Sequence, residues 1–563
     1  MSRFVDGVIA TAGRAGTGMV TGEPDAPARR TWSDLHALAR RVAGALVEDG
    51  LRPGQAVAVL AGLPAEIAPV AQAIWLAGGS MTMLHQPTPR TDLTVWRDDT
   101  LRVLKMIDAR AVIVGSPFDE VVPVLSAYGI RHHLAVDLFA GPDVPPVEAP
   151  EESVALLQLT SGSTAEPKAV RITHRNLYAN LADSRDHLGC DETGVMVSWL
   201  PMFHDMGMVG CLLLPMLTGM ELVSMTPVDF LGRPLLWAEM MSKHRATITT
   251  APNFAWAVLA RQLARLPSGA LDLSALQVAG NGAEPIDPDT MRAFVEVAGR
   301  HGFRPSAVNC CYGAAESTLV ISMSEMADPM LLDEVDAASL EERHIAAPAT
   351  SAAPPAPAAS APAPPAPVTS AAVRRIPKLG RPFPSVRVRV VGEDGTPLGE
   401  RRVGRIQLSG ESVTEGYVTP HGHEAARAED GWLDIGDEGY LADGQIVVCG
   451  RRKDVIIMGG RNIYPTDIER AAAAVDGVRE GNVAAIRLTP AADGVARESF
   501  AVLVESRQAG DEAAAHQIAQ QVTSRVTAEI DARPARVRVL PPGSLPKTPS
   551  GKLRRGAARS LLD

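Results

Sequence analysis

The apolar positions of the chain follow two alternating patterns from its start. Residues 34–48 carry apolar side chains at helical spacing behind Ser33, a candidate N-cap. The apolar face comprises Leu35, Leu38, Ala39, Val42 and Leu46. Apolar runs of strand length at 55–60 and 111–114 flank a second helical pattern at 66–76. This alternation predicts an α/β fold in which helices flank mainly parallel sheets.

The second half of the chain changes pattern after residue 449. Strand-like runs and two helical patterns follow each other closely. The run 445–449 reads as a strand before this point; after it the runs are 455–458, 483–486, 500–504 and 536–540 for strands, and 466–475 and 513–530 for helices. We therefore expect a large N-terminal domain over 1–449 and a small α+β C-terminal domain over 455–563, with the boundary at 450–454.

A composition break interrupts the large domain. Every residue from 346 to 372 is Ala, Pro, Ser, Thr or Val. Such a stretch cannot bury a core, so we expect it to be disordered or polyproline-like. It lies within an apparent insertion over 326–376.

Bulk properties narrow the class of protein. A chain of 563 residues is too long for one core. Its net charge of −11 argues against nucleic acid as the partner. Five cysteines without a CxxC pattern favour a reducing, cytoplasmic compartment, and Cys310 and Cys311 read as small core residues. The most apolar run, 206–220, is too short to cross a bilayer and predicts a buried helix.

Two strings far apart in the chain carry candidate chemistry. LTSGSTAEPK at 159–168 follows a predicted strand at 155–159 and precedes a predicted helix near His174. Its backbone N–H groups and hydroxyls suit phosphate oxygens, although it is not a Walker A loop. PKTPSGKLRR at 546–555 supplies Lys552 on a flexible loop. Together the strings predict ATP chemistry at a seam between two domains.

These strings, with five others in the same order, resemble the adenylate-forming superfamily of acyl-CoA synthetases, adenylation domains and luciferases. The others are WLPMFHDMG (199–207), NGAEP (281–285), CYGAAES (311–317), WLDIGD (432–437) and GRRKDVI (450–456). Within the superfamily, HDMG at 204–207, APNF at 251–254 and YGAAE at 312–316 are most similar to the fatty acyl-AMP ligases. The Ala/Pro tract goes beyond that pattern. The resemblance implies a mobile C-terminal domain that turns on a hinge at 450–454.

The resemblance implies an ATP site built from several segments. Residues suited to the β- and γ-phosphates are Thr160, Ser161, Gly162, Ser163 and Thr164. Lys168 adds charge there, or is only a solvated loop cation. Glu316 matches the family's Mg²⁺-associated glutamate, because one carboxylate with phosphate oxygens and waters suffices for this ion.

The same resemblance assigns the nucleoside. Tyr312 offers a face for adenine, or is a core residue, and Gly282 and Ala283 pass close to it. Asp437 accepts hydrogen bonds from the ribose hydroxyls, and Arg451 approaches the ribose from the hinge. The hinge residue itself is Lys453, which is otherwise an exposed cation.

Two residues are the candidates for catalysis. Lys552 would neutralise charge between the attacking carboxylate and the α-phosphate during adenylation. His204 would orient the acyl carboxylate, with a core histidine as the alternative, and Asp205 would cap or brace its loop. The apolar segments 206–214 and 251–256 are candidates for the acyl tunnel.

The expected function is that of a fatty acyl-AMP ligase. It would convert a medium- or long-chain fatty acid and ATP into acyl-AMP, with Mg²⁺, and pass the acyl group to the phosphopantetheine of an acyl carrier protein or a polyketide or nonribosomal peptide synthase carrier domain. The alternatives are a long-chain fatty acyl-CoA ligase and a catalytically silent nucleotide-binding scaffold. The family's insertion argues against the CoA ligase, because it impedes the domain movement that CoA transfer needs.

Overall fold

The structure is a computed structural model that describes residues 2–14, 16–87, 91–160, 166–349, 373–488, 498–547 and 552–562. The predicted phosphate-binding residues Ser161, Gly162, Ser163 and Thr164 lie outside these ranges. Most of the Ala/Pro tract lies outside them as well.

Two large sheets form the centre of the N-terminal domain. The first has eight strands and is parallel from β7 to β6. In sheet order they are β21 (Gly422–Ala425), β20 (Gly416–Thr419), β8 (Lys168–Thr173), β7 (Val154–Thr160), β4 (Ser80–Met83), β3 (Ala56–Leu60), β5 (Ala109–Val114) and β6 (His132–Leu134). The strands predicted at 55–60, 111–114 and 155–159 are confirmed.

The second sheet has nine strands, with six of them, from β13 to β1, in parallel. In sheet order they are β17 (Arg381–Pro382), β14 (Val320–Met323), β13 (Val308–Gly313), β12 (Val278–Asn281), β11 (Ile248–Ala251), β9 (Val195–Ser198), β10 (Glu221–Ser224), β1 (Gly18–Thr21) and β2 (Ala28–Thr31). The predicted α/β fold of mainly parallel sheets is therefore confirmed.

A third sheet is antiparallel throughout its four strands. Its strands are β18 (Val386–Val391), β19 (Gly404–Gly410), β22 (Leu433–Ala442) and β23 (Gln445–Arg451). β23 ends at the predicted hinge, so this sheet leads the chain into the C-terminal domain.

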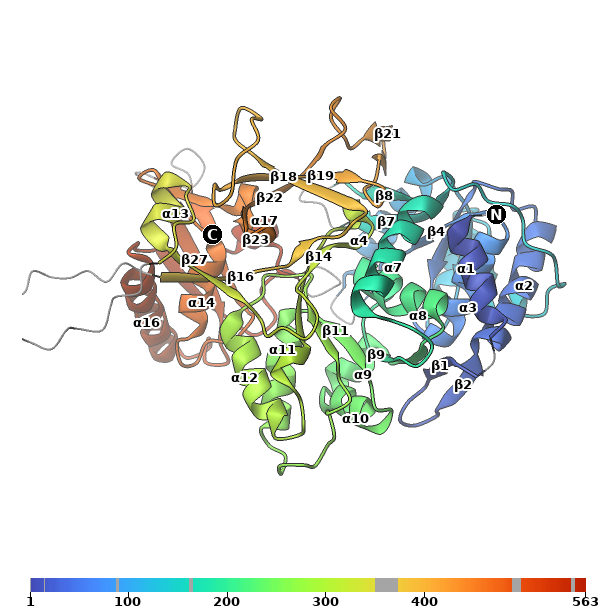
Figure 1. Ribbon diagram of the computed structural model, residues 1–563, viewed down its shortest axis with the longest axis horizontal. Helices are drawn as coiled ribbons and strands as arrows, with labels where there is room; N and C mark the ends of the chain where they lie inside the picture. The colour runs from blue at the N-terminus through green and yellow to red at the C-terminus, as the bar shows by residue number, and fades with distance from the viewer. Residues whose placement is uncertain are drawn as a thin grey trace, which may run out of the picture.

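Helices cover the two large sheets (Figure 1). They include α1 (Arg3–Ala12), α2 (Trp32–Glu48), α3 (Pro64–Leu76), α7 (His174–Leu188), α11 (Asn253–Leu263) and α12 (Pro288–Gly299). The start of α2 differs from the prediction, because the N-cap is Thr31, which forms a reciprocal capping box with Asp34 and lies two residues before the expected Ser33. Ser33 is therefore inside the helix.

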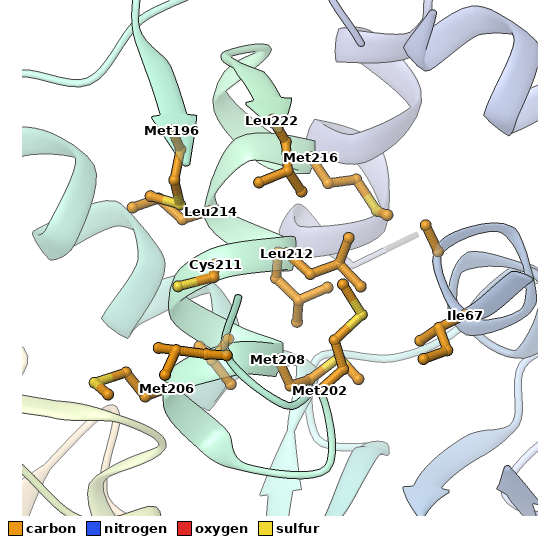
Figure 2. Packing of buried hydrophobic residues seen from close by; sticks show 14 of the residues in the cluster. Ile67, Met196, Met202, Met206, Met208, Cys211, Leu212, Leu214, Met216 and Leu222 are labelled. Atoms are coloured by element: carbon orange, nitrogen blue, oxygen red, sulfur yellow. The ribbon is translucent and has the colours of Figure 1, made fainter. Parts of the chain in front are cut away.

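The apolar run at 206–220 is a buried helix, as predicted, with an unusual first half. Met206–Leu213 (η2) is π-helical and continues into α8 (Leu214–Thr218). Figure 2 shows side chains of this run, among them Met206, Met208 and Leu212, with Met196 of β9 beside Leu214. π-helical turns are rare in proteins, and those that do occur often lie at functional sites.

One predicted connection is wrong. The polar string at 159–168 was expected to join a strand to a helix, but it joins β7 to the antiparallel strand β8. Residues 168–173 pair with β7 along their length, and 169, 170 and 172 are buried. The described parts of the string, 159–160 and 166–168, therefore lie at the ends of two antiparallel strands.

The C-terminal part has its own apolar core. It contains β24 (Ile456–Met458), β25 (Arg461–Ile463), α14 (Pro465–Ala473), β26 (Val483–Leu488), β27 (Ser499–Glu505), α16 (Glu512–Ile530), β28 (Arg536–Leu540) and α17 (Arg555–Ala558). All the predicted strands and both predicted helices of this part are present. The hinge at 450–454 stays a prediction.

The insertion forms a small structure that lies among the C-terminal elements (Figure 1). β15 (Leu332–Asp336) pairs with β16 (Val373–Pro377), and α13 (Ala337–Arg343) follows β15. The start of the Ala/Pro tract is not as predicted: Ala346 is fully buried and donates its N–H to Arg401 O at 2.9 Å. The small side chain of Ala346 fits into this apolar cluster, and the hydrogen bond to Arg401 holds its backbone in place.

A membrane-crossing helix is not found in the part of the chain that the structure describes.

Candidate active site

A cleft of 2320 Å³ opens between the large sheets and the C-terminal domain. Each predicted site residue that falls in the described ranges lines it. These residues are Thr160, Lys168, His204, Gly282, Ala283, Tyr312, Glu316, Asp437, Arg451 and Lys552. The fold thus brings seven distant segments to one place, while the roles of the residues stay predictions.

One end of the cleft combines a hydroxyl, a cation and a carboxylate. Thr160, the last residue of β7, lies opposite Lys168, the first of β8. The buried hydroxyl of Thr160 has no hydrogen-bond partner among the described residues. Lys168 Nζ lies 3.8 Å from Glu316 Oε1. A buried hydroxyl beside a lysine and a carboxylate suits phosphate oxygens and a hard cation.

Tyr417 completes this end of the cleft. Its hydroxyl donates to Glu316 Oε1 at 3.2 Å, and Lys168 Nζ lies 3.9 Å from its ring centroid. The short helix η4 (Ala315–Ser317) carries Glu316, whose carbonyl accepts the N–H of Thr414 at 2.8 Å. Sequence analysis did not identify Tyr417, because its relation to Glu316 and Lys168 exists only in the folded sheet.

Three predicted nucleoside residues contact each other directly. Asp437 Oδ2 accepts the hydroxyl of Tyr312 at 2.7 Å, and Asp437 Oδ1 lies 2.9 Å from Arg451 Nε. Burial raises the pKa of Asp437 despite the neighbouring Arg451 charge. Burial also raises the pKa of Tyr312, with Asp437 adding to the effect. Each carboxylate oxygen has a second acceptor position, which leaves room for hydroxyl donors.

The backbone at 281–284 closes tightly on β13. A Cβ at Gly282 would lie 2.9 Å from Cys311 O, so only glycine fits without a shift. Ala283 has a φ of 67°, in the left-handed region. Such strained residues persist where the surroundings fix them, often at functional sites.

His204 and Asp205 form a pair at the start of the π-helix. His204 Nδ1 lies 2.8 Å from Asp205 Oδ1, which also accepts the N–H of Met206 at 2.7 Å. Asp205 therefore caps the helix, which is one of the two roles predicted for it. Burial alone would raise the pKa of Asp205, but the nearby His204 and Lys552 charges bring the pKa to about 2. Asp205 is thus an anion that faces the catalytic candidate Lys552.

Two further residues of the cleft were missed. His85 lies at 5.6 Å from the Phe203 ring, and its pKa is lowered by burial and by His204. Glu284 accepts the N–H of Phe254 at 2.7 Å, and burial raises its pKa although Lys552 and Lys547 oppose this. The motif NGAEP contained a signal for Glu284, whereas His85 has no motif around it.

Another part of the cleft is a mostly apolar slot along the second sheet, while charged residues of the C-terminal domain line much of the remainder. It runs from Thr250 and Gly280, near the carboxyl ends of β11 and β12, to Ile248 and Val278 at their amino ends. Its opposite wall comes from α7, η2 and α8. The wall residues include Leu188, Gly210 and Leu214. The predicted tunnel segments 206–214 and 251–256 both contribute, through residues such as Met206 and Phe254.

The two neighbouring cysteines differ from each other. Cys310 is fully buried, as predicted, but Cys311 is only partly buried and lines the cleft. Alternate residues of a strand point to opposite faces, so only one of the two can lie in the core. Burial raises the pKa of Cys310 to about 12, which keeps the thiol neutral.

The chain matches the family model described as AMP-binding enzyme over residues 15–418. It is 49% identical over 565 residues to Rv1013 of Mycobacterium tuberculosis, which is provisionally named a ligase, with all of both chains covered. It is 30% identical to the long-chain-fatty-acid–AMP ligase FadD26 of Mycobacterium marinum over 94% of this chain and 90% of that protein.

A solved structure from a study of fatty acyl-adenylate ligases of E. coli and L. pneumophila has the same fold. Its TM-score is 0.86 at 31% identity, and the match covers 100% of this chain and 97% of that one.

Proposed function

Because the chain belongs to the AMP-binding enzyme family, we propose that it is a fatty acyl-AMP ligase. It joins a medium- or long-chain fatty acid to ATP as acyl-AMP with release of pyrophosphate, and passes the acyl group to the phosphopantetheine thiol of a carrier protein. The observation that carries this proposal is the single cleft that contains a polar end, an apolar slot and Lys552.

The polar end fits ATP. Thr160 and Lys168 face the polyphosphate, while Tyr312, Asp437 and Arg451 hold the nucleoside. The carboxylate oxygen of the fatty acid attacks the α-phosphorus as the bond to pyrophosphate breaks. Lys552 stabilises the negative charge that gathers between these two anions.

The residues present also fit Mg²⁺. Glu316 would be the carboxylate ligand, and the buried Thr160 hydroxyl lies in the same end of the cleft. The ion would neutralise phosphate charge when it is bound.

The apolar slot supports a medium- or long-chain acyl group. Residues 278–282, which are four residue steps apart, span about 13 Å at the usual rise of a parallel strand. His204 and Met206 lie in the same cleft as the slot, and His204 orients the carboxylate at its mouth. The slot walls are apolar, which suits a hydrocarbon chain and not a polar acid.

Contacts of the insertion support a carrier protein, instead of CoA, as the acceptor. Arg374 of β16 lies 2.9 Å from Asp467 of α14, and both side chains are buried. The Arg374 guanidinium also lies 4.2 Å from the Tyr464 ring centroid. Glu341 of α13 pairs with Arg461 of β25 at 2.7 Å. We call these four charged residues the seam pairs.

The seam pairs connect the insertion to the C-terminal domain in the orientation that places Lys552 in the cleft. Removing one partner of a buried pair costs about 3–5 kcal/mol, so a domain rotation that separates the pairs is strongly opposed. The seam pairs therefore hold the C-terminal domain in the orientation used for adenylation. A carrier protein has a surface that can bind and stabilise the rotated domain, whereas free CoA has none.

The test is adenylate formation without an acceptor. Purified protein, ATP, Mg²⁺ and fatty acids of increasing length are incubated, and acyl-AMP and pyrophosphate are measured. Equal amounts of both products with medium or long chains are expected. ATP binding without any acyl-AMP across the series would contradict the proposal and favour a silent nucleotide-binding scaffold.

A further inference from the structure

Tyr417 lies between two charged residues of the polar end that differ in sign. It belongs to β20, which pairs with β8 so that Tyr417 is opposite Val170 and Val418 is opposite Ala169. Lys168 is two residues from Val170, so its side chain is on the same face as Tyr417 and diagonal to it. Aromatic and long side chains reach each other across such diagonals.

The contacts of Tyr417 use two different parts of its side chain. The ring face holds the ammonium of Lys168, with Nζ 3.9 Å from the centroid. The hydroxyl donates to Glu316 Oε1 at 3.2 Å. Lys168 Nζ lies 3.8 Å from the same oxygen, which is longer than a hydrogen bond. Tyr417 thus occupies Oε1 and holds the lysine beside it.

The second carboxylate oxygen of Glu316 is in a different situation. Among the described residues, no hydrogen bond or ion pair involves Glu316 Oε2. Without the tyrosine hydroxyl, the Lys168 ammonium could close on the carboxylate and neutralise it. A carboxylate that is tied up by a lysine is a poorer ligand for Mg²⁺, which needs ligands in near-octahedral positions.

We infer that Tyr417 is a positioning residue that separates Lys168 from Glu316, so that the lysine serves the phosphates and Glu316 Oε2 serves Mg²⁺. This inference rests on the proposed function, because it takes Glu316 as the Mg²⁺ ligand. The backbone fixes Tyr417 beside Glu316, because the N–H of Thr414, three residues before Tyr417, donates to the carbonyl of Glu316.

Two substitutions separate the two contacts. Tyr417→Phe keeps the ring face for Lys168 and removes the hydroxyl. Tyr417→Leu removes both. Tyr178→Phe and Tyr178→Leu are matched controls, because the Tyr178 ring also carries a cation, the guanidinium of Arg3 at 4.7 Å, but does not line the cleft.

The experiment is calorimetric titration of ATP without fatty acid, first in EDTA and then over a series of Mg²⁺ concentrations. With Tyr417→Phe, ATP affinity in EDTA should stay within about twofold of wild type, and the Mg²⁺ concentration for half-maximal tightening should rise about tenfold. With Tyr417→Leu, affinity in EDTA should also fall, by about threefold. The Tyr178 variants should match wild type.

The outcomes separate the inference from the proposed function. A Mg²⁺ midpoint of Tyr417→Phe within twofold of wild type overturns the role of Tyr417, as does a fall in melting temperature without a change in that midpoint. If the ATP affinity of the wild-type protein does not change with Mg²⁺ concentration, Glu316 is not the Mg²⁺ ligand. The inference about Tyr417 is then wrong as well. Acyl-AMP formation in the acceptor-free test decides the proposed function independently.

Discussion

The floor of the acyl slot and the seam between insertion and C-terminal domain are both buried, but different forces hold them. The slot floor is formed by apolar side chains of β9, η2 and α8. The seam is crossed by buried ion pairs, with Arg374 8% exposed and Asp467 12% exposed. Apolar packing is not directional, whereas an ion pair is satisfied in one arrangement only.

This difference separates two tasks within one enzyme. In the proposed function the slot accepts a flexible hydrocarbon chain, and methionines such as Met196 and Met206 adapt to irregular shapes. In the same proposal the seam holds one orientation of the domain that carries Lys552. A buried ion pair adds little net stability but penalises every arrangement that breaks it. Changes at the seam should therefore alter the choice of reaction, and changes at the slot the choice of substrate.

The largest expected effect comes from Lys552, which the C-terminal domain brings to the slot. Lys552→Ala should lower adenylate formation by about a hundredfold or more, because the charge between carboxylate and α-phosphate loses its partner. Transfer from a supplied acyl-AMP should stay within about threefold. Both half-reactions are measured separately, with Lys105→Ala as the surface control. Equal losses in both would contradict the assignment.

The slot is tested by filling it. A Cβ at Gly210 would meet Leu319 Cδ2 at 3.1 Å, and both residues line the cleft. Gly210→Leu should lower kcat/KM for long-chain acids at least about tenfold and leave short acids nearly unchanged. The matched control is Gly299→Leu, at an open position on α12. A uniform loss over all chain lengths would show that Gly210 does not border the acyl chain.

The seam is tested by replacing both partners of its buried pair. Arg374→Leu with Asp467→Leu removes the charges without leaving one of them unpaired, so folding should be kept. CoA thioester formation should rise about tenfold while adenylate formation stays within about threefold. The exposed pair Arg375 and Glu334, 3.0 Å apart on the same hairpin, provides a control as a double glutamine variant.

Failure of the seam variant to gain CoA activity, with normal adenylation and an unchanged melting temperature, would mean that the ion pair does not restrict the domain.

The smallest expected effect is the contribution of the Asp205 carboxylate to the free energy of unfolding. Its pKa of about 2 lies below the ordinary value of 3.8, so the folded state binds this proton less tightly than the unfolded state does. The stabilisation, about 2 kcal/mol, is present above pH 4 and is lost as the pH falls through 2. Asp205→Asn should show this deficit in urea unfolding at pH 7 and a smaller one at pH 3. Asp119→Asn is the surface control. A deficit that does not shrink in acid would contradict the ionised state of Asp205.

Much of this architecture could be predicted from local pattern. Apolar runs and helical spacing located β3, β5, β7 and most elements after residue 455, though not β25 or α17, because burial on one or both faces leaves a period in the sequence. The site residues were found because their strings match known motifs. None of that required knowledge of which strands pair.

The misses have a common physical cause. The strand nature of 168–173 depends on pairing with β7 and β20, and Tyr417 reaches Glu316 only across that pairing. Ala346 is buried because the distant residues Val335 and Tyr440 enclose it. Contacts between distant segments leave no period in a single sequence.

The most direct test of the central claim is a competition between acceptors. The enzyme is given ATP, Mg²⁺, a long-chain fatty acid and equal concentrations of CoA and a holo carrier protein, and both thioesters are measured over time. We expect acyl-carrier to accumulate with CoA unacylated. Acyl-CoA as the main product would contradict the account, because the seam would then not determine the acceptor.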